Sequence, residues 1–165
     1  MKLVKPTKKY TESWKEAMQE FRKENPESPR YASLDIEEYI QNMEDYSQGK
    51  NLPNGFVAST MYWLIDDEKF VGYVEIHHEL NDKLTKEGGH VGYAIRPTER
   101  RKGYGKKILE LTLPKAQQLG IKKVLITCDD VNVASWKIIE KNGGVLQDKI
   151  EVDGKLVRRY WIDLE

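Results

Sequence analysis

Apolar residues recur with a helical period in the first part of the chain. Four of them lie three or four positions apart and share one face of a predicted helix: Trp14, Ala17, Met18 and Phe21. Thr11 precedes this stripe and is the expected N-cap. Residues 25–29 contain two prolines, which predicts that the helix ends there.

A second amphipathic helix is predicted after residue 35. Its apolar stripe consists of Ile36, Tyr39, Ile40 and Met43. Asp35 with Glu38 three residues later resembles a capping box, in which each side chain accepts a hydrogen bond from a free backbone N–H at the helix start.

From residue 60 the period changes to that of strands. Residues 61–65 and 70–77 are rich in aromatic and β-branched side chains, and the polar residues 66–69 between them indicate a hairpin turn. Residues 81–89 are predicted to be a loop. A further strand is expected over residues 90–96, where Pro97 ends it.

The remaining segments alternate between helix and strand. A helix over 104–119 carries Pro114, which removes one backbone hydrogen bond. Residues 123–128 have the apolar composition of a buried strand, and 132–142 follow as a helix. Two strands, 145–152 and 155–164, flank the dipeptide Asp153–Gly154, which favours a tight hairpin.

The order is strand, helix, helix, three strands, helix, strand, helix and two strands. It predicts an α/β fold with one mixed, mostly antiparallel sheet flanked by helices, β-α-α-β-β-β-α-β-α-β-β, in a single domain over residues 1–165.

Charge and composition narrow the function classes. The 165 residues include 27 basic and 27 acidic side chains, so no global field attracts nucleic acid or an anionic membrane. Cys128 is the single cysteine, which excludes an internal disulfide framework and a multi-cysteine metal site. The first residues lack the apolar run of a signal peptide, and no run reaches the roughly 20 apolar residues of a membrane span. A soluble, cytoplasmic protein is expected.

The candidate chemistry lies where a strand, a basic loop and a helix start follow one another. The first turn of a helix has free backbone N–H groups and a dipole that favours an anion. Gly103 and Gly105 at this helix start permit a close approach of a bulky phosphate. Five basic side chains surround it: Arg100, Arg101, Lys102, Lys106 and Lys107. The segment therefore predicts a phosphate or pyrophosphate site.

Two common phosphate motifs do not fit this segment. It lacks the spacing of a Walker loop, and Ile108 occupies the position of the third glycine of a dinucleotide fingerprint. The pattern Arg100-x-x-Gly103-x-Gly105 resembles the acetyl-CoA pyrophosphate loop of the GNAT superfamily of N-acetyltransferases. A basic, solvated helix start is the alternative interpretation of this pattern alone.

A second block strengthens the resemblance. Asn132-x-x-Ser135, followed by Glu140-Lys141-Asn142-Gly143, looks like the second GNAT motif, in which an asparagine opens a helix. Residues 76–81 and 88–93 are similar to a branch of predicted bacterial acetyltransferases. The order of elements from residue 60 to 164 also matches the family.

The resemblance implies where the cofactor, acetyl-CoA, binds. Strands 90–96 and 123–128 should splay so that the pantetheine arm pairs with the backbone of Ile95, and Gly92 is the candidate for a bulge that opens the gap. Asn132 would bind the pantetheine with Ser135 nearby, although both residue types also suit ordinary helix capping. The residues implied for the pyrophosphate are Arg100, Arg101, Lys102, Gly103, Tyr104, Gly105 and Lys106.

The implied reaction is direct attack of a primary amine on the thioester. His90 is the first candidate for the base that deprotonates the amine, with Glu75 and His77 as alternatives on one face of the preceding strand. The family often has a tyrosine before Glu-Lys to protonate the leaving thiolate, but Ile139 stands there. Other possible donors are Tyr93, Tyr160, Cys128 or water.

Several questions stay open at the level of sequence. The acceptor is a small molecule or a peptide, a homodimer is possible, and Tyr31 is a candidate for shaping the acceptor pocket. His77 and His78 face opposite sides of a strand, so no metal site is expected. The alternative function is a non-catalytic acyl-CoA binding module, and nucleic-acid binding through the basic loop is disfavoured by net neutrality.

Overall fold

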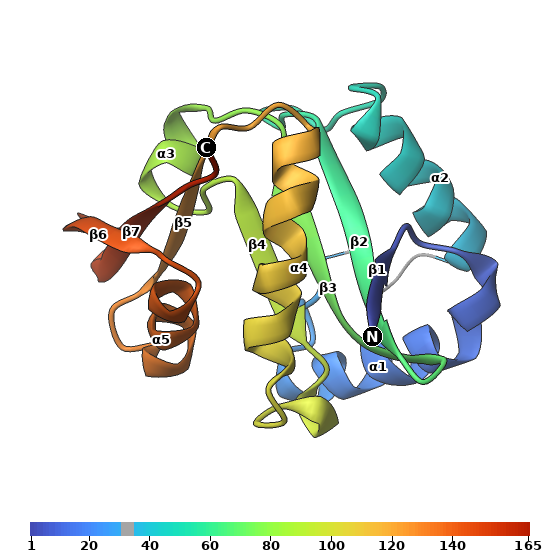
Figure 1. The fold of residues 1–165 in the computed structure, drawn as a ribbon. Coiled ribbons are helices and arrows are strands. Elements are labelled where there is room, and N and C mark those ends of the chain that lie inside the picture. The colour runs from blue at the N-terminus through green and yellow to red at the C-terminus, as the bar shows by residue number, and fades with distance from the viewer. Residues whose placement is uncertain (31–34) are drawn as a thin grey trace.

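The computed structural model describes residues 1–30 and 35–165, and Figure 1 shows how the elements are arranged. Short 3-10 turns lie at Lys8–Tyr10 and Pro97–Glu99. The other elements in chain order are β1 (Lys2–Val4), α1 (Thr11–Glu24), α2 (Ile36–Ser47), β2 (Ser59–Asp66), β3 (Lys69–His77), α3 (Asp82–Lys86), β4 (Val91–Ile95), α4 (Tyr104–Gln118), β5 (Lys123–Asp129), α5 (Val133–Lys141), β6 (Val145–Val152) and β7 (Lys155–Asp163).

The strands form two antiparallel sheets, with the orders β1-β2-β3-β4 and β5-β7-β6. This confirms the predicted class, an α/β fold with antiparallel strands flanked by helices. The predicted sheet is divided into two hydrogen-bonded parts at β4 and β5. These two strands lie next to each other and run in the same direction, because α4 returns the chain between them (Figure 1).

Each face of the first sheet has its own apolar core. Alternate residues of β2 and β3 point to opposite faces, so one set packs with α4 and α5 and the other with α1 and α2. The first core includes Leu64, Val74, Ile108, Ile126 and Ile139. The second is an aromatic cluster that includes Trp14, Tyr39, Trp63 and Phe70.

Of three local predictions on helix caps and loops, the structure confirms one and contradicts two. Asp35 caps α2 as predicted, because its side chain accepts from the backbone N–H groups of Glu37 and Glu38. Thr11 is not the cap of α1: it is the first helical residue, and its hydroxyl donates to the carbonyl of Lys8. The predicted loop 81–89 contains α3, whose N-cap Asn81 accepts from the Leu84 N–H.

The two sheets touch at one end of β4. The backbone N–H of His90 donates to the Leu125 carbonyl at 2.7 Å, and the Leu125 N–H donates to Nδ1 of the His90 ring at 2.9 Å. A Cβ at Gly89 would lie 2.3 Å from the Leu125 carbonyl oxygen, so this close approach requires glycine. From this contact toward their C-terminal ends, β4 and β5 separate (Figure 1).

The separation does not come from a bulge at Gly92, so that prediction is wrong. Gly92 lies opposite Glu75 in the uninterrupted register of β3 and β4. The register shifts lie elsewhere, between Leu64 and Ile65 and between Leu146 and Asp148.

The helices of the described residues are too short or too polar to cross a lipid bilayer.

Candidate active site between the two sheets

A cavity of about 300 Å³ lies between β4 and β5 where the two strands separate. Its lining comes from β4, from β5 and from the start of α5, and includes Gly92, Tyr93, Cys128, Asn132 and Ser135. We call this cavity the gap. It is the part of the structure in which backbone groups of β4 lack a neighbouring strand.

The register of β3 and β4 identifies which backbone groups of β4 face the gap. The Arg96 N–H donates to the Val71 carbonyl and the His77 N–H to the His90 carbonyl. In an antiparallel ladder every second residue bonds to the partner strand, so Gly92 and Ala94 also bond to β3. The backbone groups of Tyr93 and Ile95 consequently point away from β3, to the side on which the gap lies, and the Ile95 carbonyl accepts there from the Arg100 side chain.

The loop between β4 and α4 has the backbone conformation of an anion site. Arg101 and Gly103 have positive φ angles of 63° and 87°, and Gly103 is the N-cap of α4. Left-handed residues in such a loop turn successive N–H groups to one side, and the helix dipole adds positive potential there. A Cβ at Gly103 would meet no atom within 4 Å, so this side of the loop is open.

Gly105 also has a packing role. A Cβ at Gly105 would lie 2.7 Å from Cδ1 of Ile138, which belongs to α5. Gly105 therefore permits the close packing of α4 against α5.

Most charged side chains of the loop have partners within the protein. The Arg100 side chain donates to the Ile95 carbonyl at 3.2 Å and to Glu24 at 2.8 Å. The buried Glu99 accepts from Lys69 and from Lys102, and these contacts, first of all the one from Lys69, hold the Glu99 pKa below its usual range.

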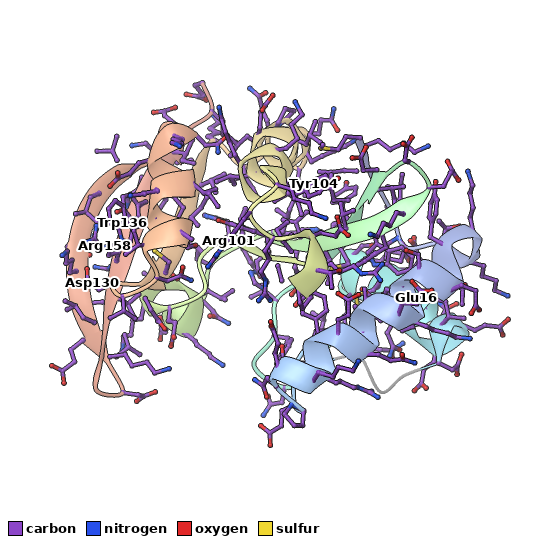
Figure 2. All side chains as sticks on the ribbon, turned by 90° about the horizontal axis from the view of Figure 1, so that it is seen from below. Glu16, Arg101, Tyr104, Asp130, Trp136 and Arg158 are labelled. Carbon is purple, nitrogen blue, oxygen red and sulfur yellow. The ribbon has the colours of Figure 1, made fainter. Side chains whose placement is uncertain are left out.

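The side chains of Tyr104 and Arg101, which also belong to this segment, point in different directions. The Tyr104 hydroxyl donates to Asp66, which raises the pKa of Tyr104 to about 12 and directs the ring away from the loop. Arg101 has no ion pair or hydrogen bond among the described residues. Figure 2 shows it at the loop between α4 and the side of α5.

The loop is fastened to α1 by a buried guanidinium. Arg96 is 5% exposed, and its side chain bonds to Glu20 at 2.7 Å and to Glu16 at 3.2 Å. Glu20 also accepts from the Thr98 hydroxyl at 2.9 Å. Burial opposes the charge of Glu20, but the bonds from Arg96 and Thr98 lower its pKa in sum. These contacts with α1 thus fix the position of the loop.

The start of α5 brings two polar side chains to the gap, those of Asn132 and Ser135. Asn132 caps the helix, since its side chain accepts from the Ser135 N–H at 3.1 Å. The Ser135 hydroxyl lies 3.4 Å from the Tyr93 hydroxyl. Burial raises the pKa of Tyr93 above its usual value, and burial raises the pKa of the Cys128 thiol to about 11. Both groups are therefore neutral at pH 7.

A second cavity, of about 130 Å³, lies on the face of the first sheet that packs against α1 and α2. We call it the front pocket. Its residues come from α1, α2, β2, β3 and two connecting segments: Trp14, Met18, Pro29, Arg30, Tyr39, Phe56, Met61, Tyr73 and Glu75. Tyr31 lies outside the described residues.

One residue of the front pocket is paired across two strands with one residue of the gap. Glu75 lines the front pocket, Gly92 lines the gap, and the two lie directly opposite each other on β3 and β4. Among the described residues, no atom lies within 4 Å of where a Gly92 Cβ would be, so the space beside Gly92 is open.

Glu75 is held in a polar group with His77 and Ser59. The Ser59 hydroxyl donates to one Glu75 oxygen at 2.7 Å, and the other oxygen lies 3.9 Å from Nε2 of His77. Nδ1 of His77 lies 3.0 Å from the Gly89 carbonyl, which only accepts hydrogen bonds. The proton of a neutral His77 is therefore on Nδ1, and its Nε2 lone pair faces Glu75.

The other two predicted catalytic residues have partners of their own within the protein. His90 is 8% exposed, its Nδ1 accepts from Leu125, its ring packs against Trp161, and burial lowers its pKa. Tyr160 is fully buried between Arg158 and Glu140, which bond to its hydroxyl at 3.1 and 3.0 Å.

Arg158 also bonds to Asp130 at 2.6 Å and stacks on Trp136, as Figure 2 shows near α5. Ile139, at the position of the family tyrosine, is fully buried in the core.

Sequence reasoning missed Ser59 and most of the front pocket. The pocket residues are spread over 62 positions from Trp14 to Glu75 and belong to elements with ordinary amphipathic patterns. Sequence reasoning gave Tyr93 only as one of several possible proton donors for the thiolate. The signal that could have ranked it higher is its place next to Gly92 on the strand that lines the gap.

These features define an α/β protein with an open gap between two parallel strands and a loop with left-handed residues before the helix at one end of it. A family model described as the acetyltransferase (GNAT) domain matches residues 6–145, so the chain belongs to this family. No curated protein matches the sequence significantly.

Solved structures with the same fold are similar over their whole length. An acetyltransferase from Salmonella typhimurium that modifies the N-terminal serine of ribosomal protein L7/L12 is 16% identical, with a TM-score of 0.67 over 99% of this chain and 94% of that chain. The structure of RimL, a ribosomal L7/L12 alpha-N-protein acetyltransferase, in complex with coenzyme A has the same values. The microcin C7 self-immunity acetyltransferase MccE, in complex with acetyl-CoA and AMP, is 17% identical, with a TM-score of 0.69 over 98% and 91%.

Proposed function

We propose that residues 1–165 form one catalytic unit that transfers the acetyl group of acetyl-CoA to a primary amine. The coenzyme occupies the gap, with its diphosphate on the N–H groups of the loop before α4 and its pantetheine on the backbone of β4. The amine enters from the front pocket. The family membership and the coenzyme-bound similar structures support the cofactor.

The observation that carries this proposal is that Glu75, which lines the front pocket, lies opposite Gly92, which lines the gap. Residues opposite each other in an antiparallel pair have Cα atoms about 4.5–5.5 Å apart. A thioester beside Gly92 and an amine beside Glu75 are then within reach of each other across one strand spacing. The chemistry needs this adjacency, since holding both reactants in place replaces a bimolecular encounter.

Glu75 is the proposed base. An ammonium has no lone pair, so a proton must leave before attack, and a carboxylate in contact with the amine or with one bridging water accepts it. His77 faces the second Glu75 oxygen and provides a further acceptor for that proton. His90 is less suited, because its Nδ1 accepts from Leu125 and the ring lies at the contact of the two sheets.

Two groups of β4 are proposed to complete the reaction. Backbone N–H groups of Tyr93 and Ile95 face the gap and are positioned for the oxyanion that develops on the thioester carbonyl. The Tyr93 hydroxyl lines the same cavity and is neutral at pH 7, so it has a proton for the departing thiolate. The hydroxyl of Tyr160 has two partners in the core and is the weaker candidate.

Replacement of Glu75 by glutamine tests the function. We expect Glu75→Gln to lower kcat about 10²- to 10⁴-fold, the usual contribution of a general base, and to leave the Kd for acetyl-CoA unchanged. Release of free coenzyme A, followed with a panel of amines, reports kcat, and calorimetry reports Kd. Glu79→Gln is the matched control, because Glu79 is exposed and lies outside the front pocket.

Two results would contradict the proposal in different ways. Binding of acetyl-CoA by the unaltered protein without turnover of any amine would favour an acyl-CoA binding module. Full activity of Glu75→Gln would move the base to another residue.

A further inference from the structure

The front pocket has a composition that restricts the acceptor. Trp14, Met18, Tyr39 and Met61 are each at most 5% exposed, and they form an apolar floor against the aromatic cluster under α1 and α2. Glu75 is the one carboxylate in the lining of this pocket among the described residues. The side of the pocket next to Gly92 is thus acidic and its remainder is apolar.

The volume of the pocket sets the size of the group that fits. About 130 Å³ is close to the roughly 150 Å³ of an engineered apolar cavity that binds benzene. A group the size of one six-membered ring fills such a space. A sugar ring with several hydroxyl groups would lose its hydrogen bonds to water there, since the floor offers few polar partners.

The positive charge of Arg30 at the mouth of the pocket disfavours an acceptor that has a second cationic group. Arg30 lines the pocket, and its guanidinium lies 4.1 Å from the centre of the Phe56 ring. With the amine beside Glu75, another ammonium on the same molecule would lie on an apolar wall or near Arg30, and both positions are unfavourable.

We propose, on the basis of the proposed function, that the acceptor is a small primary amine with a single positive charge and an aromatic or similarly bulky apolar body. The ring lies on Trp14, Tyr39 and Tyr73, and the amine lies beside Glu75. Phe56 closes the outer side of the ring. This class excludes polyamines and aminoglycosides as preferred acceptors.

Three amines test the class: 2-phenylethylamine, 1,5-diaminopentane and propylamine. We expect kcat/KM for 2-phenylethylamine to exceed that of both others at least about tenfold, because burial of one ring side chain in an apolar site has an effect of this order. Equal or higher kcat/KM for 1,5-diaminopentane would overturn the proposal. A preference for hexanoyl-CoA over acetyl-CoA would also overturn it, because the pocket would then hold the acyl chain.

Variants at the mouth link the preference to the pocket. Phe56→Ala should lower kcat/KM for 2-phenylethylamine about three- to tenfold and lower kcat/KM for propylamine less. Leu119→Ala is the control, since Leu119 and Phe56 are both 37% exposed and Leu119 lies at the end of α4. Arg30→Glu should raise the ratio of 1,5-diaminopentane to 2-phenylethylamine about two- to fivefold, and Arg22→Glu should not. Equal losses of kcat/KM for 2-phenylethylamine and propylamine in Phe56→Ala would contradict the assignment of the ring to this pocket.

A binding measurement separates this proposal from the proposed function. Calorimetry with 2-phenylethylamine, in the presence of coenzyme A, reports occupation of the pocket without any reaction. Binding that Phe56→Ala weakens supports the acceptor class even if no acyl transfer occurs, in which case the proposed function alone fails. Acyl transfer to other amines, with no binding of 2-phenylethylamine, rejects the acceptor class and leaves the function intact.

Discussion

At the scale of single residues, His90 shows how one side chain connects the two sheets. Its backbone N–H and its ring Nδ1 form a pair of hydrogen bonds with the carbonyl and the N–H of Leu125. An acceptor at the position of Nδ1 is needed there, because a buried N–H without a partner costs about 1–3 kcal/mol. The ring therefore has a structural reason to be where it is.

Two variants of His90 separate the structural role from catalysis. His90→Ala should lower the free energy of unfolding by about 1–3 kcal/mol, since it leaves the Leu125 N–H unpaired. His90→Asn places an amide oxygen near the position of Nδ1 and should recover much of this loss. Chemical denaturation gives the free energies. If His90 is the base instead, His90→Asn will be as inactive as His90→Ala while it is more stable.

Glu75 illustrates why a catalytic residue is difficult to rank from sequence. Its alternation with His77 on one strand face was visible, and the structure confirms that both lie on the face toward the front pocket. Ser59 and Gly92 complete its surroundings from two other strands. Contacts across strands depend on register, which the apolar pattern alone does not determine at residue resolution.

At the scale of elements, β4 is the strand with one paired and one open edge. The alternation of its backbone groups predicts an alternating pattern of amide hydrogen exchange. The N–H groups of Gly92 and Ala94, which bond to β3, should be protected with and without coenzyme A. Those of Tyr93 and Ile95 should become protected only when coenzyme A is bound. NMR measures this residue by residue, and equal protection of all four amides without ligand would contradict an open edge.

Helix α4 offers an internal control for the anion site, because a glycine with a similar φ lies at each end. Gly103 (φ 87°) and Gly120 (φ 85°) both have open space at the Cβ position. Gly103→Asp should weaken acetyl-CoA binding at least about tenfold, since a carboxylate then stands against the diphosphate. Gly120→Asp carries equal backbone strain at the opposite end and should leave the affinity unchanged.

The stability of the same two variants should change in the opposite order. Aspartate favours the N-terminus of a helix and is unfavourable at the C-terminus, so Gly120→Asp should be the less stable by about 0.5–1 kcal/mol. Calorimetric titration and thermal denaturation report the two effects separately. Equal affinities in both variants would reject the loop assignment.

Periodicity predicted most of the elements because their apolar stripes are long and regular. The bounds of α4, β5 and the terminal hairpin agree with the expected ranges to within a few residues. The short helix α3 was missed because five residues contain little more than one turn, which is too short to show a period. The gap was implied by the resemblance alone, since no local pattern records that two strands diverge.

At the scale of the whole molecule, charges fasten the halves of the site to each other. Arg96 ties the loop before α4 to Glu20 on α1, and Glu99 receives Lys69 from β3 and Lys102 from the loop. The cofactor loop and the helix that lines the front pocket are thereby held in one arrangement. These contacts need ionised carboxylates, and their strength consequently depends on pH.

Unfolding free energy should therefore fall with acidification in two separate windows. Burial lowers the pKa of His90 and His78 in the folded state, so the unfolded chain binds more protons and stability falls as the pH decreases from about 6.5. The pKa of Glu20 and Glu99 is also lowered, through bonds from basic groups, and their contribution is lost only below about pH 4.5.

Asparagine variants of the two histidines assign the upper window. His90→Asn with His78→Asn should flatten the fall between pH 6.5 and 5 and leave the lower window in place, because asparagine does not titrate. Denaturation at a series of pH values measures both. Protonation of His90 at Nδ1 would set two N–H donors against each other at the contact with Leu125, so the first acid-induced loss of structure should be at the join of β4 and β5. A profile that the histidine variants do not change would mean that this contact does not control the stability of the two sheets together.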